Sequence, residues 1–354
     1  MAGDDEYNGT KIVEERHRLD EAALDKWMRE HVEGYAGPLT ILQFKGGQSN
    51  PTFRLNTPEA SYVLRRKPLG KLLPSAHAVD GEFKVISALH AQGFPVARAF
   101  ALCMDDAVLG SAFYVMQMVE GRMFWDQSMP AASRDERRPL YFACIEALAK
   151  LHNLEPDRIG LGDYGRPGNY FARQVERWSK QYRASETEKI DEVEHLLDWL
   201  PKTVPEQDRV AVVHGDFRLD NMIFHPNERR IIAVLDWEPS TLGDPLADFS
   251  YFLMHWVSPA TEKTVALADV DLEAANIPNM QELTDIYCRL TGRDGIPNLN
   301  WYFAFNLFRL TGILQGIAAR VRDGTASSSK ASLAAARVVP LAKVAWRFAQ
   351  KAGA

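Results

Sequence analysis

The stretch His214-Gly-Asp-Phe-Arg-Leu-Asp-Asn221, followed by Val234-Leu-Asp-Trp-Glu238, decides the fold class of this chain. Asp216 stands on a turn after an apolar run, where a carboxylate can accept a proton from a substrate hydroxyl. Asn221 and Asp236 offer oxygen ligands, which suit Mg²⁺, a hard cation that relies on waters and substrate phosphates. A short hairpin between Asn221 and Asp236 would bring these two side chains together. The pattern therefore predicts a site for phosphate chemistry on a hydroxyl.

The composition describes an ordinary globular chain of 354 residues, with 46% hydrophobic and 25% charged residues. That length predicts two or so compact units. The formal net charge of -6 argues against nucleic acid as a partner, because such proteins usually carry a basic excess. Three cysteines in apolar surroundings predict buried free thiols and a reducing compartment: Cys103, Cys144 and Cys288. With no signal peptide and no apolar run long enough for a membrane, we expect a cytoplasmic protein. Its oligomeric state stays open.

The patterning changes near residue 120 and predicts an α+β fold with two lobes. We expect a flexible tail over residues 1–18, a small β-rich lobe over 19–119 with one key helix, and a large, mainly helical lobe over 120–354. The named segments of the first lobe are a turn at 45–50, a strand at 61–67 and a helix at 80–92. Those of the second are a polar loop at 214–221 and an acidic segment at 234–238.

Taken together, these motifs resemble the aminoglycoside phosphotransferase and choline kinase family of the protein-kinase-like fold. Within it, the sequence looks most similar to the kinase-like domains found fused to acyl-CoA dehydrogenases. The resemblance runs from about Leu39 to Gln315. It implies two lobes that hold ATP between them, and transfer of the γ-phosphate of Mg-ATP to a small-molecule hydroxyl.

The family pattern assigns roles to the polar loop. The resemblance makes Asp216 the catalytic base, and places Arg218 where protein kinases have a lysine directed at the γ-phosphate. It makes Asn221 and Asp236 the Mg²⁺ ligands. Asp248, on the following helix, looks like the aspartate that ties down the backbone of this loop.

The turn between the first two strands of the small lobe resembles the phosphate loop of choline kinases. Gly46 and Gly47 would let backbone N–H groups approach the phosphates, and Ser49 and Asn50 would add side-chain donors. A Gly-Gly turn in a hairpin is common in itself, and its position upstream of the His-Gly-Asp motif favours the functional interpretation.

The strand Tyr62-Val-Leu-Arg-Arg-Lys67 departs from protein kinases, which have Ala-x-Lys here. Alternation places Val63, Arg65 and Lys67 on one face of the strand. The resemblance then puts Val63 over the adenine and Arg65 at the phosphates, paired with Glu82 of the next helix. Lys67 remains the alternative phosphate anchor.

The segment that joins the lobes resembles the hinge whose backbone hydrogen-bonds the adenine. Met116 and Met118 are either adenine contacts or plain core residues.

Other interpretations of the same residues remain. Any one of Asp216, Asn221 and Asp236 could be a turn residue, but their joint spacing favours a site. A nucleotide-binding pseudokinase module is the alternative of another class. Paired histidine spacing for zinc and a Gly-x-Ser-x-Gly elbow are both absent from the sequence.

The acceptor follows only from the resemblance, which suggests a hydroxy acid or a hydroxyacyl-CoA. Aminoglycosides, choline-like molecules and sugars are the alternatives. From residue 301 onward the chain has eight basic residues and one acidic residue, Asp323. Such a segment is either a solvated basic face or a wall that attracts an anionic acceptor. Arg309, inside an apolar helix, would pair with a carboxylate or face the acceptor.

Overall fold

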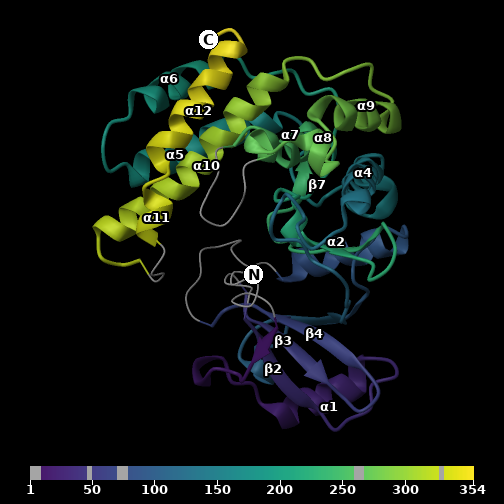
Figure 1. Ribbon diagram of the computed structural model, residues 1–354. Helices are drawn as coiled ribbons and strands as arrows, with labels where there is room; N and C mark the ends of the chain where they lie inside the picture. The colour runs from purple at the N-terminus through teal and green to yellow at the C-terminus, as the bar shows by residue number, and fades with distance from the viewer. Residues whose placement is uncertain (1–8, 46–49, 70–78, 259–266, 327–330) are drawn as a thin grey trace. The chain divides into compact units, whose positions relative to one another are not determined.

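A computed structural model describes residues 9–45, 50–69, 79–258, 267–326 and 331–354 of the chain (Figure 1). The chain divides into two compact units. Unit 1 comprises Met1–Trp125, Asp157–Tyr164 and Asp220–Ser240, and unit 2 comprises Asp126–Pro156, Gly165–Leu219 and Thr241–Ala354. The first division lies near the expected change at residue 120. Residues 220–240, which we expected in the second lobe, belong to unit 1 in this division.

Unit 1 is built on a six-stranded antiparallel sheet with the strand order β1-β2-β3-β4-β6-β5. Its strands are β1 (Thr10–Lys11), β2 (Thr40–Phe44), β3 (Thr52–Asn56), β4 (Ser61–Arg66), β5 (Ala99–Cys103) and β6 (Phe113–Gln117). Strand β1 pairs with the edge of β2. Residues 10–11, which we expected in a loose tail, therefore form part of the sheet.

One face of the sheet packs against helix α1 (Glu21–His31). The Asp20 carboxylate accepts a hydrogen bond from Ala23 N at 2.9 Å, so Asp20 is the N-cap of this helix. Trp27 lies edge-on to Phe113 of β6, with ring centroids 4.8 Å apart. The buried core on this face also includes Leu24, Met28, Phe53, Leu55, Tyr62 and Leu64.

Helix α2 (Val79–Ala91) contacts strands β5 and β6 and carries Glu82 to Arg65 of β4. The alternation predicted for β4 is confirmed, because Tyr62 and Leu64 join the α1 core while Arg65 reaches α2. The burial of the Arg66 side chain was not expected from the sequence.

Unit 1 also contains a two-stranded antiparallel hairpin of β8 (Met222–Phe224) and β9 (Ile231–Val234). The hairpin lies in the sequence between Asn221 and Asp236. Arg122 pairs with Phe224 through two backbone hydrogen bonds of 2.8 Å. Gly121 precedes this bridge, and a Cβ atom there would lie 2.3 Å from the Phe224 carbonyl oxygen. Glycine therefore permits the close approach that holds the hairpin to the segment after β6.

Unit 2 is mainly helical, and its described helices of eight residues or more are α4 (Arg134–His152), α5 (Tyr170–Ser185), α6 (Asp191–Trp199), α7 (Leu246–Leu253), α9 (Met280–Thr291), α10 (Leu299–Arg322) and α12 (Val338–Lys351). Helices α10 and α12 lie side by side, as the green and yellow ribbons of Figure 1 show. Two short strands, β7 (Ala211–Val213) and β10 (Thr241–Gly243), pair antiparallel and flank the start of the polar loop 214–221.

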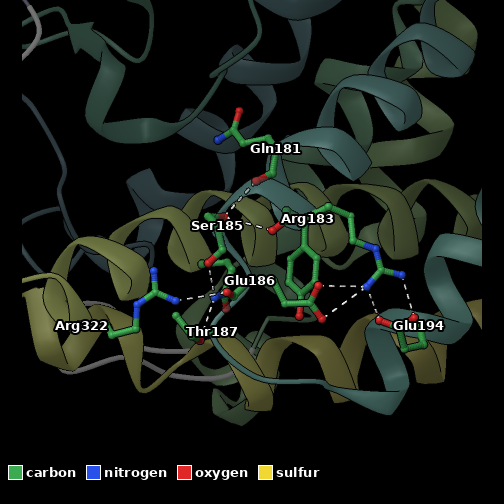
Figure 2. A network of polar contacts seen from close by, with 9 residues as sticks. Gln181, Arg183, Ser185, Glu186, Thr187, Glu194 and Arg322 are labelled. Carbon is green, nitrogen blue, oxygen red and sulfur yellow. Dashed lines mark hydrogen bonds and ion pairs between the residues drawn. The ribbon is translucent and has the colours of Figure 1, made fainter.

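A polar network fixes the connection between α5 and α6 to helix α10 (Figure 2). Arg183 makes a two-pronged contact with Glu194, at 2.6 and 2.7 Å. From α10, Gln315 donates to the Ser185 carbonyl at 2.8 Å, and Arg322 donates to the Glu186 carbonyl at 3.3 Å. The backbone carbonyls of Ser185 and Glu186 thus accept hydrogen bonds from α10. These bonds hold the end of α5 against α10.

The three cysteines are free and buried, as the sequence predicts. Within the described ranges, no helix combines the length and apolar character needed to span a membrane.

Changing Gly121 to alanine should destabilise unit 1, because the added Cβ would overlap the Phe224 carbonyl. We expect a loss of about 1–3 kcal/mol in the free energy of unfolding, the usual cost of overpacking. Thermal unfolding measures it. Gly295→Ala is the matched control, since nothing lies within 4 Å of a Cβ at that position. Equal melting temperatures for the two variants would contradict the close approach.

Candidate active site

The phosphate-side cluster of unit 1 consists of Arg65, Glu82, Asp236, Glu238 and Asn50. The Arg65 guanidinium lies 3.0 Å from Glu82 Oε1, 3.1 Å from Asp236 Oδ1 and 3.6 Å from Glu238 Oε2. Asn50 Nδ2 donates to Glu238 Oε2 at 3.2 Å. The structure therefore brings together Arg65 and Glu82, the pair expected from the sequence, and adds Asp236 and Glu238 to it.

Burial and neighbouring charges shift the pKa values of Glu82 and Arg65 in this cluster. Burial raises the pKa of the Glu82 carboxyl to about 7 although Arg65 opposes the rise, and the charges of Asp236 and Glu238 add to it. Burial alone would lower the pKa of the Arg65 guanidinium, but the adjacent Glu82 carboxylate raises it above its ordinary value. Arg65 is therefore charged throughout the working pH range. Three acidic side chains, Glu82, Asp236 and Glu238, thus lie within 3.6 Å of this one guanidinium.

Asp236 is held in an unusual backbone conformation. Its φ of 64° lies in the left-handed region, which aspartate and asparagine enter more readily than other non-glycine residues. The preceding amide, Leu235 N, donates to the Asn221 carbonyl at 2.8 Å, so the two expected metal-ligand positions are joined through their backbone. In the part of the chain that the structure describes, no three His, Cys, Asp or Glu side chains form a metal cage.

The expected adenine contacts meet in the sheet. Val63 of β4 lies directly opposite Met116 of β6 in the antiparallel register. Met118 follows the end of β6 and is half-buried. Three residues of the expected phosphate loop lie outside the described residues: Gly46, Gly47 and Ser49.

The base-side cluster of unit 2 surrounds Asp216, which follows β7. Asp216 Oδ2 accepts a hydrogen bond from Arg218 Nε at 3.2 Å, and Oδ1 accepts one from the Tyr251 hydroxyl at 2.7 Å. Asp216 N donates to His214 Nδ1 at 3.2 Å. Between them, Gly215 has a φ of 84°, a conformation that favours glycine. The carboxylate is partly exposed, with 21% of its side-chain surface accessible.

A buried carboxylate, Asp248 of α7, holds the start of loop 214–221. Its oxygens accept hydrogen bonds from His214 N at 2.6 Å and from Gly215 N at 2.8 Å. Burial lowers the pKa of His152, whose Nε2 lies 3.4 Å from the same carboxylate. The neutral ring can donate there and accept at Nδ1 from the Tyr287 hydroxyl, 2.7 Å away. The hydrogen bonds from His214 N and Gly215 N are the backbone contact that the sequence led us to expect of Asp248.

Sequence reasoning overlooked two members of these clusters. Glu238 follows Asp236 by two residues in Val234-Leu-Asp-Trp-Glu238, and this spacing was the available signal. Tyr251 gave none, because it lies 35 residues from Asp216 on an apolar helix.

A profile of the phosphotransferase enzyme family matches residues 40–283, more than half of the chain. The chain belongs to this family. The predicted resemblance is confirmed, including its narrower part. Acyl-CoA dehydrogenase family member 11 from Pongo abelii is 42% identical over 342 residues, which cover 95% of this chain and 44% of that protein. Family member 10 from Mus musculus is 40% identical over 346 residues, covering 97% and 32%. The chain thus spans less than half of each of these two relatives.

Solved structures of the family confirm the α+β, protein-kinase-like fold. A Ralstonia eutropha JMP134 protein, provisionally described as an aminoglycoside phosphotransferase, is 49% identical with a TM-score of 0.87, covering 94% of this chain and 99% of that chain. An aminoglycoside phosphotransferase solved with ADP and hygromycin B is 15% identical with a TM-score of 0.58, covering 92% and 98%. At that identity the likeness shows the fold alone.

Asp248→Asn should lower stability, because an amide presents an N–H group to one of the two backbone donors and leaves it unsatisfied. We expect a loss of about 2–4 kcal/mol, the cost of breaking a buried charged contact. Chemical denaturation measures it. The matched control is Asp285→Asn, which changes an exposed carboxylate on α9. An Asp248→Asn variant as stable as this control would show that the loop does not depend on the carboxylate.

Proposed function

We propose that this protein is an ATP-dependent phosphotransferase that moves the γ-phosphate of Mg-ATP to a hydroxyl of a small molecule. One observation carries the proposal: Arg65 pairs with Glu82 and also reaches Asp236, 171 residues further along the chain. This arrangement unites a phosphate-anchoring cation with a metal-ligand carboxylate in a member of the phosphotransferase family.

The phosphate-side cluster fits Mg²⁺ and nucleotide phosphates. Asn221 and Asp236 would hold the metal, and two protein ligands are the number expected for an ion that keeps waters and phosphate oxygens. Mg²⁺ would neutralise charge on the phosphates when bound. The three acidic side chains around Arg65 supply the kind of oxygen ligand that suits such a cation. Arg65 Nε and Asn50 Oδ1 are also buried with no hydrogen-bond partner in the described structure, so both could serve a ligand.

The base-side cluster fits a proton acceptor. The Asp216 carboxylate is partly exposed and its orientation is set by two donors, Arg218 and Tyr251. A carboxylate oxygen can accept more than one hydrogen bond, which suits Asp216 to take the proton of a substrate hydroxyl. Arg218 would stabilise negative charge on the transferred phosphoryl group.

For the acceptor, we propose an anionic hydroxy compound, either a hydroxy acid or a hydroxyacyl-CoA. The base-side cluster holds the guanidinium of Arg218 beside Asp216, and 39% of the Arg218 side-chain surface is exposed. Such a site should repel polycations and attract carboxylates or the phosphates of coenzyme A. The likeness to acyl-CoA dehydrogenase family members supports the same class. Aminoglycosides, choline and sugars remain the alternatives.

Two substitutions should distinguish the role of the base-side cluster from that of the phosphate-side cluster. Asp216→Asn should lower turnover by roughly 10²–10⁴-fold with nucleotide affinity kept, as loss of a positioned base requires. Asp236→Ala should weaken Mg-ATP binding itself. Steady-state kinetics and calorimetry with and without Mg²⁺ measure the two effects, with Asp285→Asn as a common control. A pseudokinase module would bind Mg-ATP and show no acceptor-dependent turnover in the unchanged protein.

An ATP-consumption screen identifies the acceptor. The panel should hold hydroxyacyl-CoAs, hydroxy acids, aminoglycosides, choline and sugars. For an anionic acceptor, KM should rise with ionic strength because salt screens the attraction between the acceptor and Arg218. Efficient phosphorylation of kanamycin-like polycations, with none of hydroxyacyl-CoAs, would overturn the anionic assignment and leave the phosphotransferase assignment standing.

A further inference from the structure

Two side chains outside loop 214–221 contact its neighbouring residues Asp216 and Gly215 from separate helices. Tyr251 is carried by α7 and Arg309 by α10. Neither belongs to the sequence motif, and they lie 35 and 94 residues from the loop atoms that they contact. Their contacts form a continuous chain from the Trp178 ring to the carboxylate of the proposed base.

Tyr251 contacts the carboxylate directly. Its hydroxyl donates to Asp216 Oδ1 at 2.7 Å, the length of a strong hydrogen bond to an ionised acceptor. Burial, followed by the charge of Asp216, raises the pKa of Tyr251 above its ordinary value. The phenol therefore keeps its proton across the working pH range and remains the donor.

Arg309 supports both the tyrosine and the loop. Its Nη2 donates to the Gly215 carbonyl at 2.8 Å, and its guanidinium carbon lies 5.3 Å from the centroid of the Tyr251 ring. The same carbon lies 5.7 Å from the Trp178 ring on α5. The sequence predicted a carboxylate partner or an acceptor contact for this residue. The described contacts are instead a carbonyl and two aromatic faces, which suit a planar cation.

We propose that Tyr251 and Arg309 are positioning residues for Asp216. Tyr251 fixes one oxygen of the Asp216 carboxylate. Arg309 fixes the Tyr251 ring and also the carbonyl of Gly215, the residue before Asp216. The polar network between α5 and α10 holds Trp178 and Arg309 in register and so supports the arrangement. The inference rests on the proposed role of Asp216 as the base.

The other titratable groups facing Asp216 do not substitute for Tyr251. Arg218 contacts the second carboxylate oxygen, Oδ2. Burial, and then the charge of Arg218, lower the pKa of His255 to about 4, so that ring is neutral above this pH. His214 accepts from the backbone of Asp216 rather than contacting its carboxylate through that nitrogen. We therefore expect the hydrogen bond from Tyr251 to influence the pH at which Asp216 is protonated.

Tyr251→Phe removes one oxygen and keeps the ring that Arg309 contacts. A donor to the ionised carboxylate favours that form, so its loss should move protonation of Asp216 to higher pH, by about 1 unit. The measurement is a pH titration of the Asp216 signal in ¹³C-aspartate-labelled protein, assigned by its disappearance in Asp216→Asn. With 3-hydroxybutyryl-CoA or water as the phosphoryl acceptor, kcat should fall about tenfold. The acidic limb of the pH profile of kcat should move to higher pH together with the titration of Asp216.

Tyr182→Phe is the matched control. Tyr182 is a buried tyrosine of α5, and its hydroxyl has no hydrogen-bond partner in the described residues. This variant should leave the titration and kcat unchanged. If Asp216 titrates at the same pH in the Tyr251→Phe and unchanged proteins, the proposal is wrong.

Arg309 is tested by the split between kcat and KM. Arg309→Met should lower kcat about tenfold with the acceptor KM unchanged, and Arg309→Lys should be equally impaired because lysine keeps the charge and loses the planar fork. A rise in acceptor KM for Arg309→Met, with normal kinetics for Arg309→Lys, would make Arg309 an acceptor-binding residue and overturn the proposal. Arg320→Met, on the exposed part of the same helix, is the control.

Turnover tests the phosphotransferase activity, and the carboxylate titration tests the role of Tyr251. Absence of turnover with every acceptor and with water would refute the proposed function. The carboxylate titration needs no turnover, so it still decides whether Tyr251 positions Asp216.

Discussion

The hydrogen bonds from two backbone amides to the buried Asp248 carboxylate are the constraint on which the base-side cluster depends. A buried carboxylate is costly unless it is well satisfied, and charge-assisted bonds from His214 N and Gly215 N supply that satisfaction. The loop therefore leaves β7 with one backbone path, through the left-handed turn at Gly215. The contacts of Tyr251 and Arg309 are useful only because this backbone is already fixed.

Three arginines of this chain show three ways to satisfy a guanidinium. Arg65 lies among carboxylates. The buried Arg66 donates to the Leu109 carbonyl at 3.2 Å and lies over the Phe53 ring, with the guanidinium carbon 5.7 Å from its centroid. Arg309 combines a carbonyl with two rings. Each arrangement uses the planar, forked cation, so lysine would not replace arginine equivalently at any of them.

Much of unit 1 and the polar loop could be predicted from the sequence because the signals are local. Helix α2, expected over 80–92, runs over Val79–Ala91, and the alternation in β4 correctly separated Arg65 from its neighbours. The edge strand at residues 10–11 was missed, since two residues are too short for periodicity to register. Contacts that join distant helices, such as that of Tyr251 with Asp216, leave no local pattern and required the structure.

The left-handed backbone of Asp236 restricts how this position can change over evolution. Glycine would keep the backbone and remove the carboxylate, whereas glutamate would keep the charge and place a longer side chain on a disfavoured φ. Asparagine alone would fit the conformation while offering a neutral oxygen to the proposed metal. Single substitutions at position 236 therefore exchange either shape or charge, so a lineage that loses this aspartate has no intermediate residue that preserves both.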